Sequence, residues 1–339
     1  MMDTYNYPIS IIRNLALVIV LVLHLRQSCE YTISGIPWEC GVPLFLIISG
    51  FLFGQGCVDN TFQWYKKRIL RIWIPFMLLF TINLSVFLIH GSKMNLSCIL
   101  QGVFALPAFN FNTIGMQHCW YIRYLLICYL LVPLLHKTCA KYTSTWGGVI
   151  IKISIIYFVV IALCQFSANI PFIGKYSSVQ ILLFMTAFYI GKIVMVKNTR
   201  IAFVTSVFIG TIVAAISYTV PFFIPSLKLK GFLSILYYAY LSLVFFGIIM
   251  SILERVFRNI LIDEKLTGVI KKFDHNTYYI YLCHYWFTSM SWWSVWGEGM
   301  NILSVIKYFF LILFTTIPFC FISESINGWI KKNIWINKL

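Results

Sequence analysis

Long apolar stretches separated by short polar breaks set the first constraint on this chain of 339 residues. A helix needs about 20 predominantly apolar residues to cross a bilayer. Only 11% of the residues are charged, whereas soluble domains carry about 25%. The sequence therefore predicts an all-α, polytopic integral membrane protein. Its helix bundle is expected to have about ten transmembrane helices, at 9–26, 38–56, 69–90, 119–136, 148–166, 177–195, 201–219, 232–252, 277–295 and 302–322.

Lys and Arg gather in alternate loops of this predicted bundle. Seventeen of them lie on the side of the two termini, and five lie in the loops of the opposite side. Because cytoplasmic loops carry the excess of Lys and Arg, we expect both termini in the cytoplasm and the protein in the inner (cytoplasmic) membrane. The net charge of +16 follows this loop pattern and does not predict a nucleic-acid partner.

The chain is expected to form a single transmembrane domain over 1–339, with no separate soluble domain. Its first apolar stretch lacks a basic n-region and a cleavage site, so it predicts a retained span. The outside loop 91–117 has an apolar middle, which indicates a re-entrant or interfacial piece. The inside loop 253–276 is charged and predicts a surface helix with a turn. The ten cysteines are scattered without a CxxC pair, so we expect buried apolar fillers, no disulfide framework and no metal.

Arg13 and His24 lie inside the first apolar stretch, where a central Arg costs roughly 2.5–3.5 kcal/mol on insertion scales. Eleven positions separate them, which places them within about 20° of each other around a helix and about 16 Å apart along its axis. Taken singly, Arg13 is typical of a topology anchor, and His24 of a polar residue near the outer interface. Their shared face predicts a fixed cation towards the cytoplasm and a proton-transfer group towards the outside.

Arg68 and Arg71 enter the third apolar stretch as i,i+3 neighbours on one helical face. They lie at the cytoplasmic end that Arg13 also occupies. Guanidinium groups bind phosphate oxygens bidentately, so the three arginines predict a site for a polyanion. Ordinary positive-inside anchoring is the alternative, and Lys66 and Lys67 are expected to serve that purpose.

The second stretch, GVPLFLIISGFLFGQG, is rich in small residues. Ser49, Gly50, Gly54 and Gly56 predict a close approach of helices. Backbone amides near Ser49 also offer a contact for a ligand, although packing alone explains most of the pattern.

Three outer or mid-membrane residues are weaker candidates for substrate contact or structure. His118 and Trp120 open the fourth stretch, near the expected depth of His24. His284 lies within the ninth stretch, where a hydrogen-bonded core histidine and a catalytic histidine are equally compatible with the sequence.

Two acidic residues at the cytoplasmic side are weaker candidates. Glu324 lies at that end of the tenth stretch, where it could form a salt bridge with a basic loop. Asp274 and His275 are neighbours in an inside loop and resemble a catalytic dyad only by adjacency.

Together these segments resemble the acyltransferase family 3 membrane proteins, which modify extracytoplasmic polysaccharides and related glycans. The matching features are Arg13-x10-His24, the segment VPLFLIISGFLFG and Arg68-x-x-Arg71. Weaker agreement comes from HCWYIRYLLICYLLVPLL, YYIYLCH and the region of Glu324, where the usual following Pro is absent. The resemblance covers nearly the whole chain.

The resemblance implies an acyl-CoA-dependent O-acyltransferase. The acyl group, usually acetyl, would move from cytoplasmic acyl-CoA to a hydroxyl of an extracytoplasmic or exported polysaccharide. Carried over by position, His24 is the catalytic histidine, Glu324 matches an acidic position loosely, and Arg13, Arg68 and Arg71 hold the anionic coenzyme. Acetyl-CoA is then a co-substrate, and no cofactor is bound permanently. The implied partners are the glycan acceptor, the lipid membrane and a possible partner acyltransferase or polysaccharide-assembly protein.

General acid–base chemistry agrees with this assignment. A histidine titrates near neutral pH and can accept the proton of an attacking hydroxyl as general base. No Ser-His-Asp or Cys-His arrangement is readable, so direct transfer is expected. The alternative function is an exporter or flippase for a glycan or lipid intermediate. The paired, Gly- or Pro-broken spans in two matching halves that many transporters show are not evident in this sequence.

Overall fold

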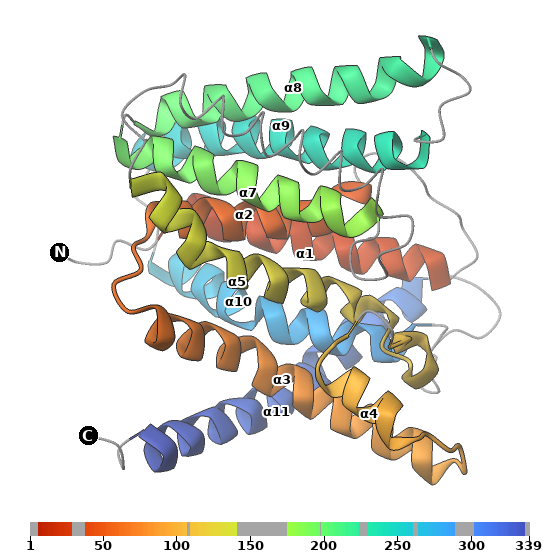
Figure 1. Ribbon diagram of the computed structural model, residues 1–339. Coiled ribbons are helices and arrows are strands. Elements are labelled where there is room, and N and C mark those ends of the chain that lie inside the picture. Colours follow the sequence, from red (N-terminus) through yellow and green to blue (C-terminus); the bar gives the residue numbers. More distant parts are fainter. Residues whose placement is uncertain are drawn as a thin grey trace. The chain divides into compact units, whose positions relative to one another are not determined.

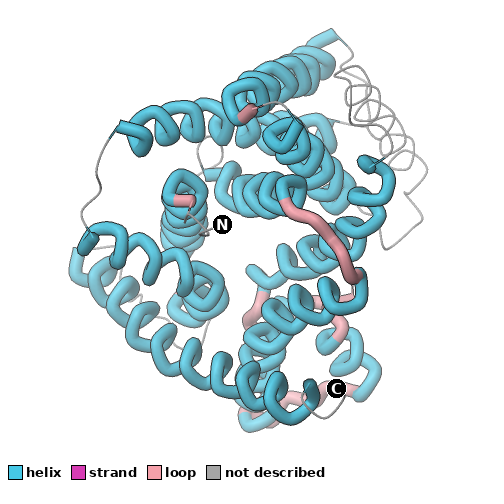
Figure 2. Tube along the Cα trace, turned by 90° about the vertical axis from the view of Figure 1, so that its left-hand side faces the viewer, coloured by secondary structure: helices cyan, strands magenta, loops and turns pink. Residues whose placement is uncertain are grey.

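The computed structural model describes residues 6–28, 38–106, 109–140, 175–196, 198–223, 230–259, 264–288 and 302–335. Within these ranges every regular element is a helix (Figure 1), as the tube in Figure 2 also shows. The longer helices are α1 (Tyr7–Ser28), α2 (Gly41–Gln55), α3 (Thr61–Ile89), α5 (Trp120–Ala140), α7 (Lys175–Val196), α8 (Thr199–Phe223), α9 (Lys230–Asn259), α10 (Glu264–Cys283) and α11 (Ile302–Trp335). The shorter ones are α4 (Leu96–Val103) and the 3₁₀ helices η1 (Trp38–Cys40), η2 (Phe111–Ile114), η3 (Gln117–Cys119) and η5 (His284–Phe287).

Six helical segments of the described residues are long and apolar enough to cross a membrane: Tyr7–Arg26, Thr61–Ile89, Gln117–Thr138, Thr199–Phe223, Leu233–Phe257 and Val305–Lys332. Two shorter apolar helices, Gly41–Gln55 and Val179–Met195, coincide with the second and sixth predicted spans. The predicted span at 148–166 and the end of the ninth lie outside the described residues. The chain is an integral membrane protein, and the count of ten spans stays a prediction.

Several helices extend past the apolar stretches that predicted them. α3 begins at Thr61 rather than 69, and α11 continues to Trp335 rather than ending at 322. At the start of α3, the Asn60 side chain accepts a hydrogen bond from the backbone N–H of Gln63 at 3.0 Å. Hydropathy marks where a helix leaves the apolar layer, whereas a cap marks where the helix begins.

Two predicted loops contain helix. The segment 91–117 includes α4, whose Asn95 cap accepts a hydrogen bond from the backbone N–H of Cys98 at 2.7 Å. α10 begins at Glu264, within the cytoplasmic loop predicted for 253–276, and continues into the ninth apolar stretch. The predicted surface helix of this loop and the start of the ninth span are therefore one continuous helix.

The chain forms two compact units. The first comprises 1–20, 34–59 and 130–274. Within it α2 packs on α7 and α8 packs on α9 (Figure 1). A Cβ added at Gly54 would lie 2.1 Å from the carbonyl oxygen of Phe188, and one at Gly50 would lie 2.4 Å from that of Phe184. The close helix approach predicted from the second stretch is confirmed at Gly50 and Gly54, but not at Gly56, where the nearest atom would be 3.7 Å away.

The second unit comprises 21–33, 60–129 and 275–339. Aromatic side chains join its helix α3 to the segment that leads into η3. The Phe76 and Phe111 ring centroids are 6.0 Å apart, and those of Phe80 and Phe109 are 5.8 Å apart. Arg123 of α5 donates to the carbonyl oxygen of Ala105 at 2.8 Å. These contacts fix the segment that carries His118.

The cysteines of the described residues are free thiols. Buried ones are Cys40, Cys119, Cys128 and Cys283. These four occupy the apolar filler positions that the sequence predicted, whereas Cys57 is exposed and Cys98 and Cys320 are only half-buried, so the prediction is wrong for those three.

Candidate functional site

Three histidines from three separate parts of the chain meet in the second unit. The ring centroid of His24, on α1, lies 5.2 Å from that of His284 at the start of η5. The His284 centroid lies 5.2 Å from that of His118 in η3. The sequence placed His118 near His24 in depth, and the structure brings both into one cluster through His284. We call His24, His118 and His284 the histidine cluster.

Each of the two inner histidines is held by a backbone carbonyl. His284 is 0% exposed, and its Nδ1 lies 2.6 Å from the carbonyl oxygen of Tyr281. His118 is 2% exposed, and its Nε2 lies 3.1 Å from the carbonyl oxygen of Leu282. Because a carbonyl oxygen only accepts, these ring nitrogens carry the protons. The other nitrogens, Nε2 of His284 and Nδ1 of His118, are buried and have no hydrogen-bond partner.

Two tyrosines connect α10 and η5 to η3. Tyr281 donates its hydroxyl to the backbone carbonyl of His118 at 2.5 Å, and Tyr285 donates to the Gln117 side chain at 2.7 Å. The Tyr285 ring stacks on His118 at 4.7 Å and meets His24 edge-on at 5.3 Å. The sequence analysis missed both tyrosines, although the aromatic run YYIYLCHYWF around His284 carries the signal.

Arg13 lies on α1 in the first unit and forms an ion pair with Asp274 of α10. The distance from Arg13 Nη1 to Asp274 Oδ1 is 2.5 Å. Ser10 donates its hydroxyl to the other carboxylate oxygen at 3.0 Å. The Arg13 side chain is 28% exposed, so one guanidinium edge binds the carboxylate while part of the group still reaches the surface. The sequence did not predict this partner.

Arg68 and Arg71 lie in the first turns of α3 in the second unit. Arg68 is half-buried and within electrostatic range of Tyr129 and Arg71, whereas Arg71 is exposed. Their shared face, predicted from the i,i+3 spacing, follows from their place on one helix. Arg13 belongs to the other unit, so the convergence of all three guanidiniums stays a prediction.

The neighbours Asp274 and His275 do not form a dyad with each other. Asp274 pairs with Arg13, while His275 Nε2 lies 2.6 Å from Glu324 Oε1. The adjacency that resembled a dyad misleads because successive helical side chains point about 100° apart. The pairing expected of Glu324 with a basic loop is instead a pairing with His275 of α10.

Glu324 lies within α11 and pairs with His275 of α10, at a distance from the histidine cluster. Its partner His275 precedes His284 by nine positions, or roughly 13 Å at ~1.5 Å per residue. Cys320 adds a third ligand-type atom, and the ligand atoms of His275, Cys320 and Glu324 lie within 4.8 Å of one another. The hydrogen bond between His275 and Glu324 explains most of this grouping without a metal ion.

The structure places the remaining candidates, Ser49 and Trp120, on α2 and α5. Ser49 is half-buried within α2 of the first unit. The backbone amides near it belong to the continuous helix α2, which uses them in its own hydrogen bonds, and a ligand contact at Ser49 stays a prediction. Trp120 is the first residue of α5 and packs against Tyr124 at 5.6 Å between ring centroids.

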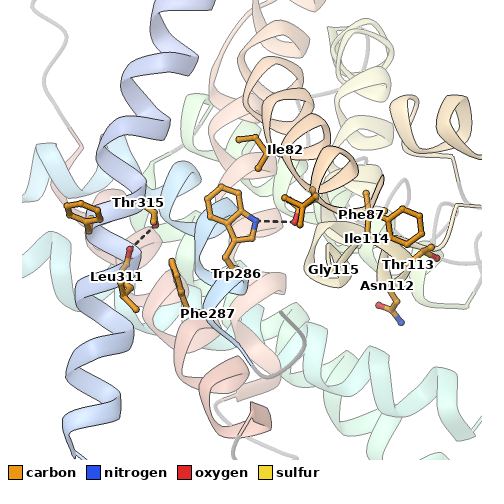
Figure 3. Close-up of a pocket in the computed structure, with 13 residues that line it drawn as sticks. Ile82, Phe87, Asn112, Thr113, Ile114, Gly115, Trp286, Phe287, Leu311 and Thr315 are labelled. Carbon is orange, nitrogen blue, oxygen red and sulfur yellow. Dashed lines mark hydrogen bonds between the residues drawn. The ribbon is translucent and has the colours of Figure 1, made fainter. Parts of the chain in front are cut away.

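A pocket of about 420 Å³ lies in the second unit, beside η5. Figure 3 shows the Trp286 indole at the centre of the pocket, with Leu311 and Thr315 on one side and Asn112 and Thr113 of η2 on the other. Trp286 donates its Nε1–H to the Asn83 side chain at 3.2 Å. The volume of this pocket falls in the range of roughly 300–1,000 Å³ found for small-molecule sites.

The residues that line this pocket carry no charged side chain. They are Ile82, Asn83, Val86, Phe87, Asn112, Thr113, Ile114, Gly115, Trp286, Phe287, Leu311, Phe314 and Thr315. A neutral ligand suits such walls better than a polyphosphate does, because a buried charge needs a partner. The sequence analysis did not find this pocket.

Comparison with known proteins gives one match. A family model described as an acyltransferase domain, Acyl_transf_3, matches residues 6–324. The match includes all three parts of the histidine cluster, the three arginines and Glu324. No curated protein and no solved structure matches this chain.

Proposed function

Because this chain belongs to acyltransferase family 3, we propose that it is a membrane O-acyltransferase that uses cytoplasmic acyl-CoA. The acyl group, most simply acetyl, goes to a hydroxyl of an extracytoplasmic or exported glycan. The proposed setting is the inner (cytoplasmic) membrane, with ten spans and both termini in the cytoplasm. The proposed partners are acyl-CoA, the glycan acceptor and the proteins that assemble the glycan.

The histidine cluster is the observation that carries this proposal. His24 is half-buried on α1, and its ring contacts His284 and Tyr285. A half-buried imidazole beside two buried ones that donate to backbone carbonyls is suited to take up and release a proton. We therefore assign His24 the role of general base.

The proposed reaction is direct transfer. The acceptor oxygen forms a bond with the thioester carbonyl carbon, and the carbon–sulfur bond breaks. The hydroxyl proton goes to His24, which then gives it to the departing coenzyme A sulfur. Atoms and charge balance without an acyl-enzyme and without an oxidant or reductant.

The arginines are proposed to hold the coenzyme. Arg71 is exposed and Arg68 half-buried at the start of α3, and guanidinium groups bind phosphate oxygens bidentately. Arg13 is proposed to assist from α1 while it keeps its ion pair with Asp274. Glu324 is retained as a proposed acidic residue of the reaction, through its hydrogen bond with His275.

The test compares His24→Ala with the unchanged protein in membranes that contain the acceptor glycan. Labelled acetyl-CoA is added, and label in the glycan is counted at equal protein level. We expect His24→Ala to abolish incorporation while acetyl-CoA still binds. Incorporation at the unchanged rate would remove the catalytic assignment. An exporter would move the glycan without incorporating label, so translocation without acylation by the unchanged protein would favour that alternative.

A further inference from the structure

We infer that His284 is a positioning residue for His24, and that it accepts a hydrogen bond from the protonated His24 ring during acyl transfer. This inference rests on the proposed function, since it assumes that His24 takes the proton. It gives a role to the Nε2 atom of His284, which is buried and has no hydrogen-bond partner.

The hydrogen bond to Tyr281 fixes the proton position in the His284 ring. Nδ1 donates to the carbonyl oxygen of Tyr281 at 2.6 Å, so a neutral His284 presents a lone pair at Nε2. That nitrogen is buried and has no partner. Unpartnered buried acceptors are uncommon, because losing water without gaining a hydrogen bond costs about 1–3 kcal/mol.

His24 is the neighbour that can use this lone pair. The two ring centroids are 5.2 Å apart and the planes are tilted by 39°. At this separation a small rotation of either ring brings one nitrogen of each to hydrogen-bonding distance, about 2.7–3.2 Å. A histidine that takes a proton gains a second N–H, which then needs an acceptor. His284 Nε2 would stabilise that imidazolium and fix its orientation, as the Asp does in a Ser-His-Asp triad.

His118 also contacts the His284 ring. Its ring meets His284 nearly edge-on at 5.2 Å and 77°, and it stacks on Tyr285. Tyr281 also binds the backbone of His118, so one tyrosine holds both histidines through its hydroxyl and its carbonyl. Cys283, the neighbour of His284 in the chain, is also 0% exposed and serves as the matched control for packing.

Two substitutions of His284 separate positioning from packing. His284→Asn keeps an amide N–H near the Nδ1 position, for the Tyr281 carbonyl, but removes the acceptor at the Nε2 position. His284→Gln places an amide oxygen near Nε2 but gives up the donor to Tyr281. A purely structural role makes His284→Gln the worse variant, because it breaks the observed hydrogen bond. The positioning role makes His284→Asn the worse variant.

The experiment measures kcat and the KM for acetyl-CoA in membranes with the acceptor glycan, at equal amounts of folded protein. We expect kcat of His284→Asn to fall about 100-fold, within the 10²–10⁴ range of general acid–base catalysis. His284→Gln should stay within about tenfold of the unchanged protein, and the KM for acetyl-CoA should change little in either. The control Cys283→Ala removes a buried side chain next to His284 without touching the histidine cluster, and it should remain nearly fully active.

Each variant is judged separately against the unchanged protein, so one folded variant suffices. A His284→Asn variant with nearly normal kcat overturns the inference, and so does a His284→Gln variant that is as inactive as His24→Ala. If neither variant folds, His284 is a packing residue and the inference is also overturned. Should His24→Ala itself remain active, the proposed function fails, and that result is distinguishable because it does not depend on His284.

Discussion

Arg13 and Asp274 form an ion pair between α1 and α10, although 261 positions separate them in the sequence. The Asp274 side chain is 12% exposed, so this carboxylate depends on Arg13 and Ser10 for the interactions that water would otherwise supply. The pair gives Arg13 a structural task in addition to the proposed contact with the coenzyme. The two tasks predict different results on substitution.

Arg13→Ala should weaken both stability and acetyl-CoA binding, whereas Asp274→Ala should weaken stability alone. Removing either partner leaves the other charge poorly compensated, at a cost of about 1–3 kcal/mol in the free energy of unfolding. The double variant should lose less stability than the sum of the losses in the two single variants, because each single substitution already removes the whole ion pair between Arg13 and Asp274. Thermal unfolding in detergent and equilibrium binding of acetyl-CoA measure the two effects. Equal losses of affinity in both single variants would mean that Arg13 acts only through the pair.

Arg71→Ala should lower acetyl-CoA affinity about tenfold or more with little change in stability. Arg71 is exposed on the first turns of α3, and a hydrogen bond to a charged group contributes about 1.5–3 kcal/mol. Lys67→Ala is the matched control, since Lys67 is also exposed on the same helix and is expected to be a topology anchor. Dephospho-forms of the coenzyme should lose less affinity on the Arg71 substitution. An equal loss in the Lys67 and Arg71 variants would indicate a general charge effect instead of a site.

The sequence predicted the helices well because each apolar stretch must satisfy its own backbone in the membrane. It also predicted that His24 and His118 share a depth, since depth follows from position within a span. The sequence could not predict the orientation of His284, the third histidine of the cluster. Its tautomer depends on a hydrogen bond to the backbone carbonyl of Tyr281, three residues earlier. The predicted helix ends differ from the observed ones where capping residues and charged turns, rather than hydropathy, determine where a helix begins or ends.

Pairings between distant segments were beyond the sequence. Asp274 was grouped with His275 because they are adjacent, yet each binds a different partner. The pocket around Trp286 was missed for the same reason: its walls come from α3, η2, η5 and α11, and no local pattern marks them. Such features follow from packing, which a single sequence does not specify.

Gly54→Ala should destabilise the first unit, whereas Gly56→Ala should be nearly neutral. A Cβ at Gly54 would lie 2.1 Å from the backbone oxygen of Phe188, so α2 and α7 would have to move apart. At Gly56, only two residues further along the chain, the nearest atom would be 3.7 Å away. We expect a loss of about 1–3 kcal/mol from overpacking at Gly54. The midpoint of thermal unfolding measures it, and equal midpoints for the two variants would contradict the observed packing of α2 on α7.

Glu324→Gln should change stability by less than about 1 kcal/mol, because both members of its pair with His275 are well exposed. If the proposed role of Glu324 holds, acyl transfer should nevertheless fall about tenfold in this variant. His275→Gln breaks the same pair and is the control. A similar fall in both variants would place the effect in the pair, and unchanged transfer in Glu324→Gln would remove Glu324 from the reaction.

Ile82→Trp should lower transfer to the acceptor without changing acetyl-CoA affinity. Ile82 lines the pocket around Trp286, and a larger side chain at this position would occupy part of its 420 Å³. Because the lining is uncharged and η5 carries both Trp286 and His284, we expect the pocket to receive a neutral part of the acceptor. Ile89→Trp is the control on the same helix, since Ile89 is 81% exposed and does not line the pocket. A several-fold rise in the KM for the acceptor, confined to Ile82→Trp, is the expected result. If both variants retain the normal KM, the acceptor binds elsewhere, and the pocket is then more simply explained as a site for a lipid chain between α3 and α11.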